Sequence, residues 1–359
     1  MPFLNWCARP PAGSRVHRDF ASRLASQIRD TGPVPFDRFV ELALYDADSG
    51  FYAVHGQAGG RRGDFITSVE AGPLFAAVIA DWLDAQWVEL GRPTPFKVAE
   101  VGAGVGTLFR GVNRAAPACF GALNYSLVER SPAMRVAHQS LPTERWRSMP
   151  TLPDEAQHVV LANELLDNLA FGIAERVDAG WASVQVGERN GELALVTGER
   201  DSSLDHLAKL APSAAVRSRV PVASVAAEWI EAARSKSDRV LIFDYAATTA
   251  ELADRGQHGW LRTYAGHQRG SDPLAHIGQC DITHDVPIDQ LAAATMQSTQ
   301  ADWLNQHGLP ERVETARQIW AERGHIGDLE ALVARSAINE AAALCDRSGL
   351  GGFVVLEWR

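Results

Sequence analysis

Residues 100–106 read Glu-Val-Gly-Ala-Gly-Val-Gly and combine a carboxylate with three glycines. They overlap the end of a short apolar run at 96–101, which is typical of a buried parallel strand. After such a strand the chain must turn sharply into a helix, and glycines permit the required backbone angles and let a ligand touch the main chain. The candidate binding positions are Gly102, Ala103, Gly104 and Gly106. The alternative is a tight turn that holds no ligand.

The glycine spacing and two acidic side chains indicate which ligand this loop would bind. The spacing is GxGxG, whereas a dinucleotide fingerprint is GxGxxG, whose final glycine would fall at Thr107. Glu100 suits a cationic group better than a pyrophosphate, and Glu129, which ends the next apolar run, could accept hydrogen bonds from both hydroxyls of a ribose. S-adenosylmethionine carries a sulfonium and an ammonium and no phosphate. The pattern therefore favours this cofactor and a class I methyltransferase over an NAD or FAD enzyme.

A second polar group, Asn163, Glu164 and Asp167, follows the third apolar run and could do the chemistry. Methyl transfer from a sulfonium is an in-line displacement, which needs alignment and a poised nucleophile. Carboxylates can bind a protonated guanidinium bidentately, and an asparagine carbonyl can accept the N–H of an amine or amide acceptor. If a helix begins here, these side chains share one of its faces. The alternative is that Asn163 and Asp167 only cap that helix.

The elements that must position these residues are short apolar runs alternating with helical segments. The runs are 96–101, 123–128, 158–162 and 239–243, and a late strand is expected at 352–358. Such alternation predicts an α/β fold with a doubly wound, mostly parallel, Rossmann-like sheet.

The remaining segments predict an extension and an insertion around one methyltransferase core. Residues 1–95 read as an N-terminal helical extension that includes a cofactor-covering loop, and 96–170 with 238–359 as the core. Residues 171–237 read as an inserted substrate cap with a β-hairpin, because Asn190-Gly191 is a favoured hairpin turn.

Several ordered motifs resemble the MidA-like family of S-adenosylmethionine-dependent methyltransferases, which includes a mitochondrial assembly factor for respiratory complex I that methylates an arginine. The segments that carry the resemblance are 39–52, 63–70, 100–106, 163–167, 244–245, 263–267, 278–283 and 299–308. The resemblance implies S-adenosylmethionine as the cofactor and a protein arginine as the acceptor. It also implies that Asp64, Thr67 and Ser68 supply hydrogen bonds from a loop that folds over the cofactor. The alternative for Ser68 is that it only caps a helix that begins near Pro73.

Four positions depart from the family motifs, beside the transferred methyl. Val69 replaces a proline, Asn168 and Ala170 stand where alanine and proline are usual, and Ala246 stands where glycine often follows Asp-Tyr. The cofactor half is intact, while the acceptor side is altered. A non-catalytic, cofactor-binding assembly or scaffold protein and a small-molecule methyltransferase are therefore the alternatives to a protein methyltransferase.

Composition limits which partners the protein can bind and indicates its cellular compartment. The net charge is −10, from 34 Lys and Arg against 44 Asp and Glu, which argues against non-specific nucleic-acid binding. No apolar run reaches the roughly 18 residues of a membrane span. The four cysteines form no metal-binding spacing, so free thiols, no metal and a cytoplasmic location are expected. Oligomeric state stays open, with a homodimer as one option.

Overall fold

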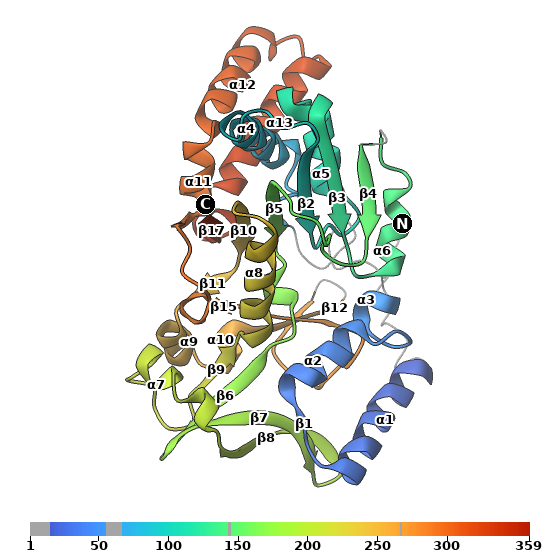
Figure 1. Cartoon of the computed structure of the whole chain (residues 1–359), viewed down its shortest axis with the longest axis vertical. Helices are drawn as coiled ribbons and strands as arrows, with labels where there is room; N and C mark the ends of the chain where they lie inside the picture. The colour runs from blue at the N-terminus through green and yellow to red at the C-terminus, as the bar shows by residue number, and fades with distance from the viewer. Residues whose placement is uncertain (1–14, 55–66, 143–144, 266–267) are drawn as a thin grey trace, which may run out of the picture.

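A computed structural model describes residues 15–54, 67–142, 145–265 and 268–359. Its central sheet has seven strands in the order β16-β17-β10-β5-β2-β3-β4 and occupies the upper half of the molecule in Figure 1. The strands from β10 to β4 pair in parallel, and β17 and β16 extend the sheet antiparallel. Their bounds are β2 Phe96–Val101, β3 Leu123–Val128, β4 Trp146–Met149, β5 Val159–Asn163, β10 Val240–Asp244, β16 Met296–Thr299 and β17 Val354–Trp358.

Helices cover both faces of this sheet because its strands are apolar on both sides. On one face, α4 (Pro73–Glu89), α5 (Thr107–Ala115) and α13 (Leu329–Leu344) share one buried core with alternate strand residues. On the other face, α8 (Ser224–Lys236) packs against the remaining strand residues. This arrangement confirms the expected α/β class, with a mixed rather than purely parallel sheet.

A second sheet lies in the lower half of Figure 1 and comprises β1 (Val34–Pro35), β6 (Gly172–Val177), β7 (Gly180–Arg189), β8 (Glu192–Arg200) and β9 (Arg219–Val222). Asn190 and Gly191 join β7 to β8 with positive φ angles of 57° and 83°. Glycine and asparagine tolerate that backbone best, which explains the turn sequence. The range 171–237 thus holds β6 to β9, while its last helix, α8, packs on the central sheet.

Between the two large sheets lie α2, α3 and a three-stranded sheet, β13-β12-β14, while α1 lies beside the lower sheet. Buried residues of α1 (Arg15–Thr31), α2 (Phe36–Tyr45) and α3 (Phe51–Val54) form one core cluster with residues of β7, β12 (Leu261–Ala265) and β14 (Asp281–His284). The arrowheads of β3 and β4 in Figure 1 point toward this middle region. The carboxyl edge of the central sheet therefore faces the N-terminal helices.

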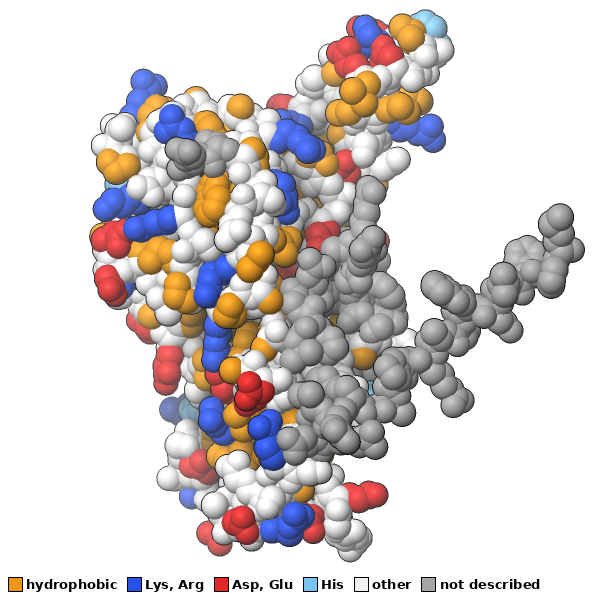
Figure 2. Space-filling view, turned by 90° about the vertical axis from the view of Figure 1, so that its right-hand side faces the viewer, with side chains coloured by type: hydrophobic (Ala, Val, Ile, Leu, Met, Phe, Trp, Pro, Cys, Tyr) orange, Lys and Arg blue, Asp and Glu red, His pale blue; other side chains and the backbone are white. Residues whose placement is uncertain are grey.

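The other elements connect these layers. They are α6 Pro132–His138, α7 Leu207–Leu210, α9 Thr249–Arg255, α10 Gln257–Trp260, α11 Gln300–Gln306, α12 Leu309–Arg323, β11 Ala246–Ala247, β13 Gln268–Gly270 and β15 Val286–Pro287. The α12–α13 hairpin projects from the top of the molecule, where Figure 2 shows hydrophobic side chains gathered. Residues exposed there are Ile326, Leu329, Leu332 and Val333.

Candidate functional site

The glycine loop leaves the end of β2 with an open backbone. Gly102, Gly104 and Gly106 have φ angles of +71°, +54° and +78°, a region that L side chains rarely adopt. The amides of Gly102 and Ala103 donate to the carbonyl of Val128 on β3 over 3.0 and 3.1 Å, which ties the loop to the neighbouring strand. A Cβ built on Gly104 would meet no atom within 4 Å. The loop therefore needs glycine for its backbone and leaves room beside Gly104 for a ligand.

Glu129 holds the same loop from the end of β3. Its Oε2 accepts the amide of Gly104 over 2.9 Å, and its Oε1 accepts the amide of Ser131 over 2.7 Å. Burial raises the pKa of this carboxyl, and the amide donors act against that rise. Each carboxylate oxygen can accept a further hydrogen bond. Glu129 can thus receive ribose hydroxyls while it fixes Gly104.

Glu100 is a buried carboxyl within β2, directly beneath the loop. The hydroxyl of Tyr125 donates to its Oε2 over 2.9 Å. Burial raises its pKa to about 8, with Glu129 adding to the rise and Tyr125 and Arg110 opposing it. A cationic ligand beside Glu100 would favour the ionised form, so this side chain suits the positively charged end of a cofactor.

The raised pKa of Glu100 predicts how the stability of the ligand-free protein depends on pH. Its pKa rises from 4.5 to about 8 on folding, so between these values the native state binds more protons than the unfolded chain. The free energy of unfolding therefore falls as pH rises through that window, by up to about 1.4 kcal/mol per pH unit for one carboxyl. We expect Glu100→Gln to remove this share of the slope in urea unfolding measured across the window. An unchanged slope would contradict the assignment.

Asn163 and Glu164 end β5 beside the glycine loop. Glu164 has a φ of +52°, and its amide donates to the carbonyl of Phe243 on β10 over 2.8 Å. Its Oε1 accepts the amide of Ser68 over 3.2 Å and the Nδ2 of Asn163 over 2.9 Å. Within the described residues, Glu164 Oε2 and Asn163 Oδ1 are buried without a hydrogen-bond partner. Two acceptor atoms are therefore available in one place for a donor-rich ligand.

Burial raises the pKa of Glu164 to about 8, and the charge of Asp167 raises it further. The donors Ser68 and Asn163 act in the opposite direction. The side chain is thus close to neutral when no ligand is present and can ionise when a cation arrives.

Asp167 is buried, and it does not lie on the face of a helix as the sequence predicted. No α-helix follows β5; instead a short 3-10 turn, Leu166–Asn168, carries Asp167. Its Oδ2 accepts the hydroxyl of Thr283 over 2.7 Å and its Oδ1 accepts the Nδ2 of Asn168 over 3.0 Å. The residue is 1% exposed, and burial raises its pKa to about 6. Both oxygens are engaged by side chains, so Asp167 influences Glu164 through its charge.

Asp244, which sequence reasoning named only as part of a motif, shapes the same turn from the end of β10. Its Oδ2 accepts the amides of Leu165 and Leu166 over 3.2 and 2.7 Å. Burial holds its pKa well above the usual range, and the charges of Asp167 and Glu164 raise it further. Its position at the end of a fourth apolar run was the signal that could have identified it.

Ser68 joins the segment before α4 to the acid cluster. It is fully buried, and its hydroxyl donates to Gln300 Oε1 over 2.8 Å while its amide reaches Glu164. Thr67 Oγ1 is buried, without a partner among the residues described. The cap of α4 is Gly72, so Ser68 does not serve as its N-cap. Asp64, predicted beside them, lies outside the described residues.

Val69, Ala170 and Asn168, which depart from the family motifs, are accommodated in different ways. Val69 packs partly buried against the core under the central sheet. Ala170 is buried with the N-terminal helices. Asn168 bonds both Asp167 and the hydroxyl of Tyr52, so it adds contacts to the acid cluster.

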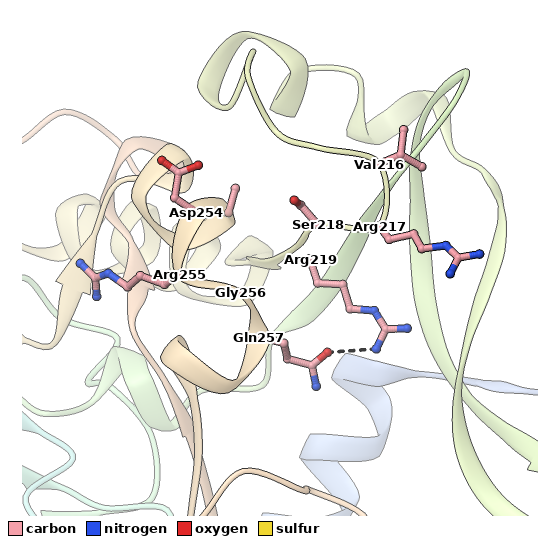
Figure 3. Close-up of a pocket in the computed structure, with 9 residues that line it drawn as sticks. Val216, Arg217, Ser218, Arg219, Asp254, Arg255, Gly256 and Gln257 are labelled. Carbon is pink, nitrogen blue, oxygen red and sulfur yellow. Dashed lines mark hydrogen bonds between the residues drawn. The ribbon is translucent and has the colours of Figure 1, made fainter.

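A separate hollow of about 360 Å³ lies away from the strand ends, between the segment before β9 and the α9–α10 junction (Figure 3). Arg219 there bonds Glu175 and Gln257, and Arg255 bonds Asp285. Two of the arginines that line the hollow are therefore already paired with side chains of the described residues.

In the part of the chain that the structure describes, no group of three or more His, Cys, Asp or Glu side chains could hold a metal ion. None of the helices resolved in it combines the length and the apolar character needed to cross a bilayer.

A family model described as "Putative S-adenosyl-L-methionine-dependent methyltransferase" matches residues 78–306, well over half of the chain. The matched range contains the glycine loop, Glu129, the end of β5 and Asp244. It thus includes the carboxyl edge of the central sheet described above.

Curated relatives match most of the chain. A Drosophila melanogaster protein named "Protein arginine methyltransferase NDUFAF7 homolog, mitochondrial" is 26% identical over 86% of this chain and 83% of its own length. The Danio rerio protein named "Protein arginine methyltransferase NDUFAF7, mitochondrial" is 25% identical over 88% of this chain and 82% of its own. Both names include the word mitochondrial and contradict the expected cytoplasmic location, which is therefore wrong. Composition and cysteine spacing cannot distinguish one reducing compartment from another.

Solved structures share the fold. A Burkholderia thailandensis protein bound to S-adenosyl-homocysteine superposes with a TM-score of 0.82 at 24% identity, covering 97% of this chain and 95% of that one. A second structure from the same organism gives 0.80 at 23% identity, covering 97% and 94%. The architecture is therefore one that solved proteins already display.

Proposed function

The chain belongs to the family of S-adenosyl-L-methionine-dependent methyltransferases, and we propose that the acceptor it methylates is an arginine side chain of another protein. The observation that carries this proposal is the pair of buried, unpartnered acceptor atoms at the end of β5, Glu164 Oε2 and Asn163 Oδ1. A guanidinium offers five N–H donors in a planar fork, which suits such a pair. The names of the Drosophila and zebrafish relatives support the same acceptor.

The residues around the glycine loop fit S-adenosylmethionine. A Cβ on Gly104 would meet no atom within 4 Å, which supports a cofactor position against the main chain there. Glu129 would accept hydrogen bonds from the ribose hydroxyls, and Glu100 would face the positively charged end of the cofactor. Thr67 and Ser68 would cover the bound cofactor. When bound, the cofactor supplies an activated methyl group on a sulfonium.

In finer terms, we propose a class I, Rossmann-like methyltransferase core at 96–170 and 238–359. Residues 1–95 would serve as the helical extension that covers the cofactor, and 171–237 as the substrate cap. The sheet order and the position of the glycine loop after β2 support this division.

Glu164 would perform two tasks in sequence. A bound guanidinium lowers the pKa of Glu164 from about 8, so the carboxyl ionises and holds the cation. With the activated methyl group of the cofactor in place, the guanidinium held here would be the nucleophile. Glu164 Oε2 would take the proton that the attacking nitrogen gives up. Asn163 Oδ1 meanwhile fixes the orientation of the acceptor N–H.

The test is to incubate the purified protein with S-adenosylmethionine labelled at the methyl and with proteins from its own cells. Precipitated protein is hydrolysed in acid, and the labelled amino acid is identified by chromatography. We expect methylated arginine. Label in another residue, or in the small-molecule fraction, would contradict the proposal. Cofactor binding with no transfer at all would favour the scaffold alternative.

A further inference from the structure

Asn168, the last residue of the 3-10 turn, joins the acid cluster to the N-terminal helices. Its Nδ2 donates to Asp167 Oδ1 over 3.0 Å, and its Oδ1 accepts the hydroxyl of Tyr52 over 2.8 Å. Its main-chain carbonyl accepts the hydroxyl of Tyr45 over 3.0 Å. The rings of these two tyrosines stack with centroids 5.4 Å apart. The side chain of Asn168 therefore links α3 to the Asp167 carboxylate, and its main-chain carbonyl adds a contact with α2.

Asp167 is fixed between this amide and a hydroxyl on the opposite side. Thr283 of β14 donates to the other carboxylate oxygen over 2.7 Å. At 1% exposure, water does not compete for either oxygen, so the two side-chain donors determine how the carboxylate is oriented.

We propose that Asn168 is a positioning residue for methyl transfer. It fixes the Asp167 carboxylate, whose negative charge supports Glu164 as the proton acceptor. The inference rests on the proposed function, because it takes Glu164 as the group that receives the acceptor's proton. Asn168 acts only through Asp167 and does not itself touch the reacting atoms.

The electrostatics of the cluster agree with this geometry. The Asn168 amide and the Thr283 hydroxyl both lower the pKa of Asp167 against the effect of burial. The charge of Asp167 in turn raises the pKa of Glu164, which makes Glu164 a stronger base. The titratable and charged groups that face Asp167 are Tyr52 of α3, Glu164 after β5, Asp244 and Tyr245 at the end of β10, Arg262 of β12, and His284 and Asp285 at the end of β14.

The first measurement needs no acceptor. Titration of the ligand-free protein is followed by the infrared carbonyl band of protonated carboxyl groups, and the Asp167 component is identified by its loss in Asp167→Asn. In Asn168→Ala, we expect the midpoint of that component to rise by about one pH unit, because the ionised form loses a donor. A midpoint that does not move would overturn the proposal.

The second measurement is the pH profile of methyl transfer to a peptide library with a central arginine. In Asn168→Ala, the acid limb of kcat, which reports the ionisation of Glu164, should shift to lower pH, because a less ionised Asp167 raises the pKa of Glu164 less. The KM for S-adenosylmethionine should stay within about twofold. One outcome is that the infrared midpoint moves although neither the wild type nor any variant methylates arginine. In that case the proposed acceptor is wrong, while the effect of Asn168 on Asp167 stands. An infrared shift without a kinetic shift in an active enzyme would overturn the positioning role.

Tyr45→Phe is the matched control. It removes a tyrosine hydroxyl that bonds the main chain of the same Asn168, and leaves the contact with Asp167 intact. Its midpoint should match the wild type, and an equal shift in this variant would mean a merely structural role. If Asn168→Ala does not fold, Tyr52→Phe, which frees the Asn168 amide from its anchor, should shift the midpoint in the same direction by a smaller amount.

Discussion

Glu164→Gln should bind S-adenosylmethionine with near wild-type affinity and transfer methyl groups roughly a thousandfold more slowly, the range expected for loss of a positioned proton acceptor. Glutamine keeps the volume and the carbonyl that accepts from Ser68 and Asn163. It removes the charge and the basic oxygen at the buried, unpartnered position. The measurement is kcat with saturating acceptor, alongside calorimetric titration with the cofactor.

Glu70→Gln is the control for charge alone. Glu70 also raises the pKa of Glu164 through its charge, but its carboxylate accepts the amide of Thr67 in its own turn, over 3.4 Å. We expect the methyl-transfer rate of Glu70→Gln to stay within about tenfold of the wild type. The charge of Glu70 is the smallest of the causes that shift the pKa of Glu164. If Glu164→Gln were no slower than Glu70→Gln, Glu164 would not be the proton acceptor.

The cofactor side of the site could be predicted because everything that defines it is local. A strand, a glycine run and an acidic residue at the next strand end follow one another within 96–129. Parallel pairing then brings the ends together, with Val101 of β2 beside Val128 of β3. What the sequence could not indicate is that Glu129 also accepts the amide of Gly104, since that contact depends on the left-handed backbone of the loop.

For the polar group proposed as the acceptor site, the sequence predicted which residues come together but not how they are arranged. A helix after β5 would have placed Asn163, Glu164 and Asp167 on one face, but the chain there turns through a positive φ at Glu164 and a short 3-10 turn. Asp167 is thereby turned toward Thr283, which lies 116 residues later in the chain. Contacts over such separations depend on how the N-terminal helices and β14 pack, and no local pattern encodes that packing.

Gly104→Leu should weaken binding of S-adenosylmethionine by at least about a hundredfold, because close approach of a ligand to the main chain depends on a glycine at this position. The backbone at Gly104 is open, with no atom within 4 Å of a built Cβ, so a leucine side chain would occupy the space proposed for the cofactor. The φ of +54° adds a cost of about 1–2 kcal/mol in the free energy of unfolding. The measurements are the Kd for the cofactor by calorimetry and urea unfolding of the ligand-free protein.

Gly191→Leu separates the loss of space from the backbone strain. Gly191 lies in the β7–β8 turn with a φ of +83°, and a Cβ there also meets no atom within 4 Å. The two variants should therefore lose similar stability, while only Gly104→Leu should lose cofactor affinity. Wild-type affinity for the cofactor in both variants would mean that the cofactor does not bind at the glycine loop. Loss of affinity in both would mean that general destabilisation, and not occupied space, governs binding.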